Sequence, residues 1–394
     1  MDLKIFTNNI EDKAREQVYT LLDQDAFKDA KVRIMPDVHA GAGCVIGFTA
    51  DLGDKVIPNI VGVDIGCGVR CSRLGKIDID LKELDKIIKS NIPSGLNVHD
   101  KPIVNATDYI DKLRCKDQLK NRDWLEKSLG TLGGGNHFIE IDEDEEGIKY
   151  LVIHTGSRNL GKQVADIYQQ KAINNLHTIP FANMRKELIT SLKEQGREKE
   201  IQNQLKEFDK KYSTIFKLPK DLCYLEGQDR EDYLHDMKIC QEFAAMNRFT
   251  ISFIIELALK IIPEFSFESV HNYISKDNMV RKGAISAHKE QPVIIPLNMR
   301  DGCIIGTGKG NEDWNCSAPH GAGRLMSRME ARRTLKLEDF KCIMEGIYTT
   351  TVNEDTIDEA PMVYKNAQEI IDNIKDTVDI VKLIKPIYNF KASE

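Results

Sequence analysis

The chain has 394 residues, a formal net charge of −7 and a hydrophobic fraction of 41%. This composition supports a folded core and excludes a generally disordered chain. Nine cysteines without a C-x-x-C pair exclude a disulfide scaffold and a zinc ribbon, and the acidic balance disfavours non-specific coating of nucleic acid. The start has no apolar block, and the apolar stretch 251–263 is shorter than the roughly 20 residues of a membrane span. We therefore expect a cytoplasmic protein with reduced thiols and no membrane contact.

The first part of the chain, residues 1–160, is rich in glycine and has a β-like pattern. Short strands are predicted over 31–35 and 45–49, and the unbroken apolar run 150–154 predicts a buried strand. The acidic run 142–146 is interpreted as the solvated tip of the hairpin that precedes this strand.

Helical spacing dominates the middle of the chain. Helices are predicted over 161–176 and 231–262, and two charged surface helices broken near Gly196 are predicted within 184–215. Strands at 265–271 and 291–296, a helix over 367–383 and a strand at 387–390 complete the pattern. Strands that come early and late around a helical middle indicate an α+β fold. We expect one large domain over 1–394, with a β-rich core around a metal pocket and a charged helical arm at 183–217.

Six short segments place glycine beside a side chain that can bind metal or phosphate. In the segment 36–41, Asp37 and His39 are two residues apart and point the same way on an extended chain, although an Asx-turn is the simpler reading. The segment 62–68 offers Asp64 and Cys67 among glycines, although a lone buried cysteine is usually structural. The segment 133–140 sets three glycines before His137, a plausible anion cradle.

The other three segments lie further along the chain. His154 ends the predicted buried strand, and Arg158 is suited to bidentate contact with phosphate. His271 follows another predicted strand, where a satisfied polar histidine is the commoner case. His320 lies among glycines just before a predicted helix with an arginine stripe, which indicates either a phosphate site or a solvated charged face. The stripe consists of Arg324, Arg328 and Arg332.

Neutral imidazoles, a thiolate and a carboxylate together form a transition-metal site, which holds two ions if the sulfur bridges them. The candidate ligands are Asp64, Cys67, His137, His154 and His271. Their convergence in space is an expectation, because a sequence does not show it. The segment 303–310 fails the P-loop pattern, so a nucleotide would have to bind by other means.

In this order, the segments PDVHAGAG, VGVDIGCGV, GGGNHFIE, HTGSRNLG, the isolated HN at His271 and SAPHGAGR resemble the RtcB family of RNA-splicing ligases. The resemblance extends from about Met35 to Lys391. It implies GTP-dependent joining of an RNA 2',3'-cyclic phosphate or 3'-phosphate end to a 5'-hydroxyl end, in RNA repair or tRNA splicing. It also implies a covalent GMP–histidine intermediate and two Mn(II) ions.

The resemblance further implies a role for each matching position. His320 matches the nucleophile, and Asp37 is expected to orient it. Asp64, Cys67 and His137 match the ligands of one Mn(II), and Cys67, His154 and His271 match those of the second. Arg158, Arg324 and Arg328 are candidates for holding the RNA phosphate. The expected guanylate contacts are Asn136, Glu140, Asn272, Pro296, Leu297, Asn298, Met299, Cys303, Gly321, Ala322, Gly323 and Lys391.

The loop 296–303 departs from the family pattern through the bulk of Leu297 and the charges of Arg300 and Asp301, which indicates a divergent bacterial-type paralogue. Two other functions stay open at this point: a metal-dependent phosphoesterase or nuclease acting on RNA ends, and an inactive RNA-binding scaffold. The natural substrate, the oligomeric state and the need for an accessory activating protein are not determined by the sequence.

Overall fold

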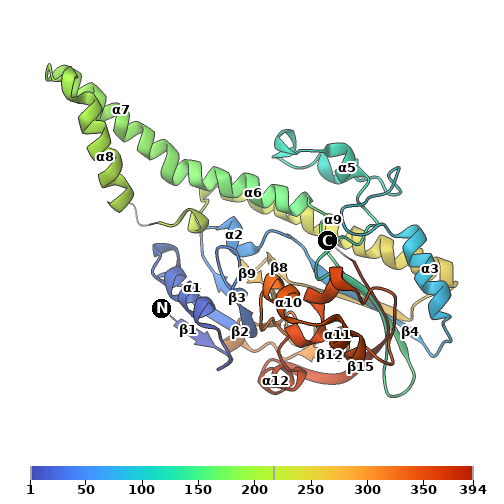
Figure 1. Ribbon diagram of the computed structural model, residues 1–394. Helices are drawn as coiled ribbons and strands as arrows, with labels where there is room; N and C mark the ends of the chain where they lie inside the picture. The colour runs from blue at the N-terminus through green and yellow to red at the C-terminus, as the bar shows by residue number, and fades with distance from the viewer. Residues whose placement is uncertain (1, 216–217, 393–394) are drawn as a thin grey trace.

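The computed structural model describes residues 2–215 and 218–392. Of the expected domain 1–394, residues 1, 393 and 394 lie outside the described residues, as do residues 216 and 217 of the expected arm. Helices surround a large sheet that curves nearly into a barrel, so the predicted α+β class is confirmed (Figure 1). Within the described ranges, no helix combines the length and the apolarity needed to cross a membrane.

An eight-stranded sheet forms the centre of the molecule, with strand order β11-β12-β15-β5-β6-β4-β7 and with β14 paired to β15. Its neighbouring strands pair antiparallel along this order. The bounds are β11 (Pro292–Asn298), β12 (Gly302–Gly308), β15 (Val378–Lys391), β5 (Phe138–Glu143), β6 (Lys149–Thr155), β4 (Gly68–Gly75), β7 (Phe265–Val270) and β14 (Tyr348–Thr349).

Two smaller sheets lie beside the central one. A five-stranded sheet has the order β1-β2-β3-β9-β8, and a ribbon pairs β10 with β13. The bounds are β1 (Asp2–Ile5), β2 (Lys31–His39), β3 (Ile46–Asp51), β9 (Met279–Lys282), β8 (Asn272–Ile274), β10 (Ala284–Ser286) and β13 (Ser317–Pro319). The strands predicted at 31–35, 45–49, 150–154, 265–271 and 291–296 are thereby confirmed.

Helix α9 (Gly227–Leu259) packs against β4 and β6 and ties the loops at one end of these strands together. Its buried Arg248 donates to the carbonyl oxygens of Gly66 and Thr155 at 2.8 and 3.0 Å. Its buried Asn247 accepts from the backbone of Gly130 at 2.8 Å. A buried polar group persists in a core when its hydrogen bonds are made, and these bonds fix the loops that carry the candidate ligands.

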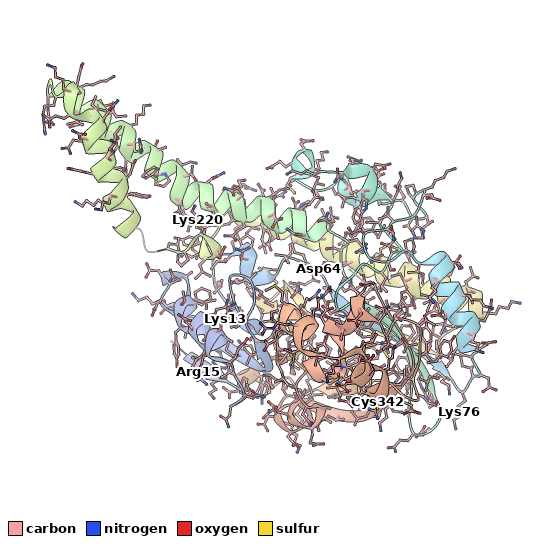
Figure 2. All side chains as sticks on the ribbon, viewed as in Figure 1. Lys13, Arg15, Asp64, Lys76, Lys220 and Cys342 are labelled. Carbon is pink, nitrogen blue, oxygen red and sulfur yellow. The ribbon has the colours of Figure 1, made fainter. Side chains whose placement is uncertain are left out.

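The predicted charged arm consists of α7 (Ile179–Glu194) and α8 (Ile201–Ile215), which project from the body (Figures 1 and 2). Helix α7 continues the line of α6 (Leu160–Ile173) through a π-helical turn at Asn174–Thr178. The remaining helices are α1 (Asp12–Leu22), α2 (Pro58–Val61), α3 (Leu81–Asn91), α4 (Thr107–Ile110), α5 (Arg122–Glu126), α10 (Arg328–Thr334), α11 (Leu337–Ile343) and α12 (Ala367–Asn373).

Three predictions about local structure are wrong. The helix predicted over 367–383 ends at Asn373, and the strand β15 begins at Val378, because its alternating residues pair with β12 and β5. The acidic run is not a fully solvated tip, because Asp142 lies buried within β5 and Asp144 accepts from Lys382. Arg324 is not on the helix with Arg328, because Ser327 caps α10.

Candidate metal and nucleotide site

Four of the five candidate ligands lie at one edge of the eight-stranded sheet. Cys67 and His137 immediately precede β4 and β5, His154 is the next-to-last residue of β6, and His271 immediately follows β7. Because β5, β6, β4 and β7 are antiparallel neighbours, these two strand starts and two strand ends meet at the same edge. Asp64 joins them from the loop before Cys67, which places it in the body of the molecule (Figure 2).

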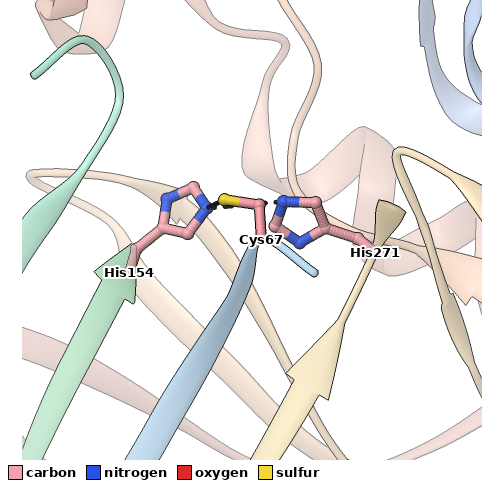
Figure 3. Close-up of side chains that lie close together, drawn as sticks. All are labelled: Cys67, His154 and His271. Atoms are coloured by element: carbon pink, nitrogen blue, oxygen red, sulfur yellow. Dashed lines mark hydrogen bonds between the residues drawn. The ribbon is translucent and has the colours of Figure 1, made fainter. Parts of the chain in front are cut away.

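The ligand atoms form two groups that share the sulfur of Cys67. The sulfur lies 3.3 Å from Nε2 of His154 (Figure 3). It lies 3.5 Å from Nε2 of His137. Nε2 of His154 lies 3.4 Å from Nε2 of His271, and Nε2 of His137 lies 3.4 Å from Oδ2 of Asp64. Within each group the ligand atoms are at most 4.8 Å apart. The predicted convergence is confirmed, and each group's donor set fits a transition-metal ion.

The far side of three of the ligands, His137, His154 and Asp64, is held by a second contact. Nδ1 of His137 lies 2.9 Å from the carbonyl oxygen of Leu132, and Nδ1 of His154 lies 3.2 Å from that of Asn136. Such contacts orient Nε2 toward a metal, as outer partners of metal-bound histidines do. Asp64 accepts from the backbone and hydroxyl of Ser157 at 3.2 and 3.1 Å. A Cβ atom at Gly156 would lie 2.2 Å from Asp64, so this position requires glycine.

The protonation of the ligands follows from their burial. Burial lowers the pKa of His154 and of His271 well below the ordinary value, so both imidazoles are neutral and can donate a lone pair. Burial and the charge of Asp64 raise the pKa of the Cys67 thiol. Burial would raise the pKa of Asp64, but the hydrogen bond and charge of His137 lower it to about 2. A cation at this position would favour the thiolate of Cys67 and release its proton.

His320 and Asp37 come to the same place from other sheets. His320 follows β13, and Asp37 lies within β2 and is fully buried. Nδ1 of His320 lies 2.6 Å from Oδ2 of Asp37, which also accepts from the backbone N–H of His320 at 3.1 Å. The His320 ring centroid lies 4.7 Å from that of His271. Asp37 therefore holds Nδ1 and leaves Nε2 of His320 free to act as a nucleophile.

A cavity of about 530 Å³ opens beside this pair. His320 and His154 line it, as does His39, whose Nδ1 lies 2.9 Å from the backbone oxygen of Asp37. The expected guanylate positions that line the cavity are Asn136, Glu140, Pro296, Leu297, Asn298, Met299, Gly321, Ala322, Gly323 and Lys391. The structure thus brings most of the expected contacts to one cavity.

Two expected guanylate positions lie away from the lining. The side chain of Asn272 donates to the carbonyl oxygen of Asp64 at 3.2 Å and accepts from the backbone of Gly283 at 3.0 Å. Cys303 is fully buried on β12, beside Glu140 and Asp142. Asn272 therefore supports the loop of Asp64, and Cys303 belongs to the interior behind the cavity wall.

Glu359 is a cavity-lining residue that sequence reasoning missed. Its buried carboxylate accepts from Arg324 at 3.0 Å, pairs with Lys391 at 3.2 Å and accepts from the hydroxyl of Tyr364. Burial would raise its pKa, but the charges of Lys391 and Arg324 lower it below the ordinary glutamate value. No glycine or motif marks Glu359 in the sequence, so only the fold identifies it.

The three candidate arginines lie in different surroundings. Arg324 and Arg328 line the cavity, with the Arg328 side chain 38% exposed. Arg158 is buried and donates to the hydroxyl of Thr131 at 2.7 Å and the carbonyl oxygen of Gly95 at 2.9 Å. Arg158 therefore braces the loops behind the metal ligands, whereas the other two arginines face the space that a phosphate group can enter.

The chain is similar in sequence to a known protein family and to several of its members. A family model described as "tRNA-splicing ligase RtcB" matches residues 24–121 and 104–392. The RNA-splicing ligase RtcB of Escherichia coli K12 is 29% identical over 436 aligned positions, which cover 99% of this chain and 97% of that protein. The tRNA-splicing ligase RtcB of Aeropyrum pernix is 27% identical and covers 89% of this chain and 85% of its own length. That of Nanoarchaeum equitans is also 27% identical, with 86% and 83% covered.

Proposed function

The chain belongs to the RtcB family of tRNA-splicing ligases, and from this premise we propose that it is a GTP- and Mn(II)-dependent RNA ligase. It joins RNA 2',3'-cyclic phosphate or 3'-phosphate ends to 5'-hydroxyl ends through a covalent GMP–His320 intermediate, in RNA repair or tRNA splicing. The observation that carries the proposal is the 2.6 Å contact of Asp37 with His320 beside two metal-ligand groups that share Cys67. One ligase domain spans 1–394, with 183–217 as an arm within it.

In the first step, Nε2 of His320 attacks the α-phosphorus of GTP. A bond forms between Nε2 and phosphorus, and the bond from phosphorus to the bridging oxygen breaks, so that pyrophosphate leaves. Asp37 holds the proton on Nδ1 and stabilises the positive charge that develops on the ring. An imidazole suits this transfer because it attacks when neutral and leaves readily when protonated.

The metal ligands and the residues that line the cavity have the remaining roles in the reaction. Asp64, Cys67 and His137 would hold one Mn(II), and Cys67, His154 and His271 would hold the second. Bound divalent ions neutralise charge on phosphate oxygens, which favours attack by His320. The thiolate by itself favours zinc or iron, so the identity of manganese rests on the family.

The nucleotide and the RNA end meet at the cavity. Lys391 and Glu140 supply a donor and an acceptor for the base, and the backbone of Gly321–Gly323 adjoins His320. Water first adds to a 2',3'-cyclic phosphate and breaks its bond to the 2'-oxygen, which leaves a 3'-phosphate. Arg324 and Arg328 hold the RNA 3'-phosphate, to which GMP is transferred from His320. The 5'-hydroxyl then attacks the activated phosphate and releases GMP. Asn272, Cys303 and Arg158 act through their neighbours, because none of the three lines the cavity.

The test uses an RNA with a labelled 3'-phosphate end, a second RNA with a 5'-hydroxyl end, GTP and Mn(II). The proposal predicts a longer strand, and it predicts that His320→Ala abolishes joining. A free 3'-hydroxyl end that forms equally with His320→Ala would instead establish a metal-dependent phosphoesterase. Single and multiple turnover are measured separately, so that the need for an accessory protein appears as a defect in turnover alone.

A further inference from the structure

A third group of metal-capable side chains lies in the interior, next to the cavity. It consists of Glu140 and Asp142 on β5 and Cys303 on β12, all buried, with ligand atoms within 4.8 Å of one another. Glu140 and Asp142 are two residues apart on one strand and therefore point to the same face of the sheet. None of the three belongs to the two groups that share Cys67.

Among the residues that the structure describes, this group contains acceptor oxygens that no strong donor reaches. Both carboxylate oxygens of Asp142 are buried without a hydrogen-bond partner, as is Oδ1 of the neighbouring Asn389, whose Nδ2 donates to Glu140 at 2.6 Å. The nearby Cys303 thiol is at best a weak donor. Burying an acceptor without a partner destabilises the folded chain. The cost recurs at several atoms here, which indicates a ligand that accepts electron pairs.

The surroundings offer little else that could compensate for the buried, unpaired oxygens. Asp142 and Cys303 are enclosed by an apolar cluster that includes Val152, Ile294 and Ile384. Burial, together with the charge of Glu140, raises the pKa of Asp142 well above its ordinary value, and burial raises that of Glu140 to about 7. The charge of Lys391 acts on Glu140, whereas for Asp142 it is a hydrogen bond from the Cys303 thiol that opposes burial and the charge of Glu140. A divalent cation would replace these protons and satisfy the oxygens together.

We propose that Glu140, Asp142 and Cys303 bind a divalent transition-metal ion of the zinc class, separate from the ions held by the groups that share Cys67. Two carboxylates and a thiolate are donors that zinc accepts, and Asn389 can contribute its oxygen. Binding releases the protons of Asp142 and the Cys303 thiol. The ion fixes the carboxylate of Glu140, which also lines the cavity. This last consequence rests on the proposed function, whereas metal binding does not.

The test uses the full-length chain with Cys67→Ser, which removes the sulfur shared by the other two groups. Cobalt(II) is added to chelator-treated protein, and the near-ultraviolet charge-transfer band from thiolate to cobalt is recorded. The band is expected in Cys67→Ser and is expected to be lost in Cys67→Ser/Cys303→Ser. Cys67→Ser/Cys71→Ser is the matched control, since Cys71 is equally buried in the same apolar cluster but outside the group. Adding Asp142→Asn weakens cobalt binding by more than about tenfold.

Absence of the band in folded Cys67→Ser protein, or its persistence after Cys303→Ser, overturns the proposal. If the Cys67→Ser variant does not fold, the test is made instead by measuring the metal content of single variants that keep Cys67. Cys303→Ser is then expected to carry one ion fewer than Cys71→Ser, and equal content overturns the proposal. GMP labelling of the wild-type chain is measured in parallel. If the chain is labelled but the cobalt band is absent, the proposal of an interior metal site fails and the proposed ligase function stands. If the band is present but labelling is absent, the proposed ligase function fails and the interior metal site stands.

Discussion

The two halves of the site are built in different ways. The metal ligands come from adjacent strand ends of one sheet, where the register of β5, β6, β4 and β7 sets their spacing. The His320–Asp37 pair joins β13 to β2 across 283 positions of sequence and depends on the packing of separate sheets. Metal binding and nucleophile activation therefore depend on different sets of packing contacts, and we expect that each can be broken by substitutions that leave the other in place.

The largest effect is expected from removing the shared sulfur. Cys67→Ser is expected to lose two ions per chain relative to the wild type, because both ligand groups contain Cys67. The loss of affinity should exceed the roughly 10- to 100-fold typical of outer-partner changes. His271→Ala, which affects one group, should lose one ion, and His320→Ala should lose none. Metal analysis after gel filtration measures all three, and full metal content in Cys67→Ser would contradict the shared-sulfur arrangement.

The next effect concerns the other half of the site. Asp37→Asn keeps the shape of the side chain but removes the charge that supports Nδ1–H of His320. The rate of GMP transfer to the enzyme should fall on the order of 10²- to 10⁴-fold. Metal content should stay at the wild-type level. Quenched-flow labelling with GTP gives the rate, and a wild-type rate would show that Asp37 has no part in activating His320.

Glu359→Gln changes the cavity proposed to bind the nucleotide, and we expect a smaller effect from it than from Cys67→Ser or Asp37→Asn. Lys391 and Arg324 lose the negative charge of their common partner, so the KM for GTP should rise about tenfold, or about 1.4 kcal/mol. Because Lys391 and Arg324 lower the pKa of Glu359 in the folded state, its ion pairs stabilise the protein above the ordinary glutamate pKa. That stability is lost as the pH falls through the lowered pKa.

Thermal unfolding measured over a range of pH tests whether this stability is lost on acidification. The wild type should be more stable than Glu359→Gln near neutral pH, by about 3 kcal/mol. The difference should shrink as the pH falls through and below the ordinary glutamate range. A difference that grows on acidification would mean that Glu359 is not held as a carboxylate by these cations.

The smallest effect is expected from the arm. The rings of Phe181 and Tyr212 lie 4.7 Å apart at its base, so residues 183–210 can be replaced by a short glycine-serine turn. The activation free energy of GMP labelling should change by no more than the roughly 0.5 kcal/mol that is typical of surface substitutions. RNA joining is measured on the same protein. A large loss of labelling would show that the arm reaches the site, and a loss of joining alone would assign the arm to RNA binding.

The sequence predicted that Asp64, Cys67, His137, His154 and His271 lie close together, because most of them occur in short glycine-containing segments that stand out from the rest of the chain. It predicted less well where tertiary contacts decide. Asp142 was placed at a solvated tip because it belongs to an acidic run, but β5 continues through Glu143 between β15 and β6. The helix over 367–383 was extended too far, because the alternation from Val378 is a strand pattern that pairing with β12 and β5 stabilises.

The most direct measurement is covalent labelling of the folded, metal-loaded chain with GTP that carries a label on the α-phosphate. We predict one GMP per chain on His320, located by mass spectrometry of the digested protein, and no label in His320→Ala. A well-folded chain with both metal ions that acquires no label, or that carries it on another residue, would contradict the proposed mechanism.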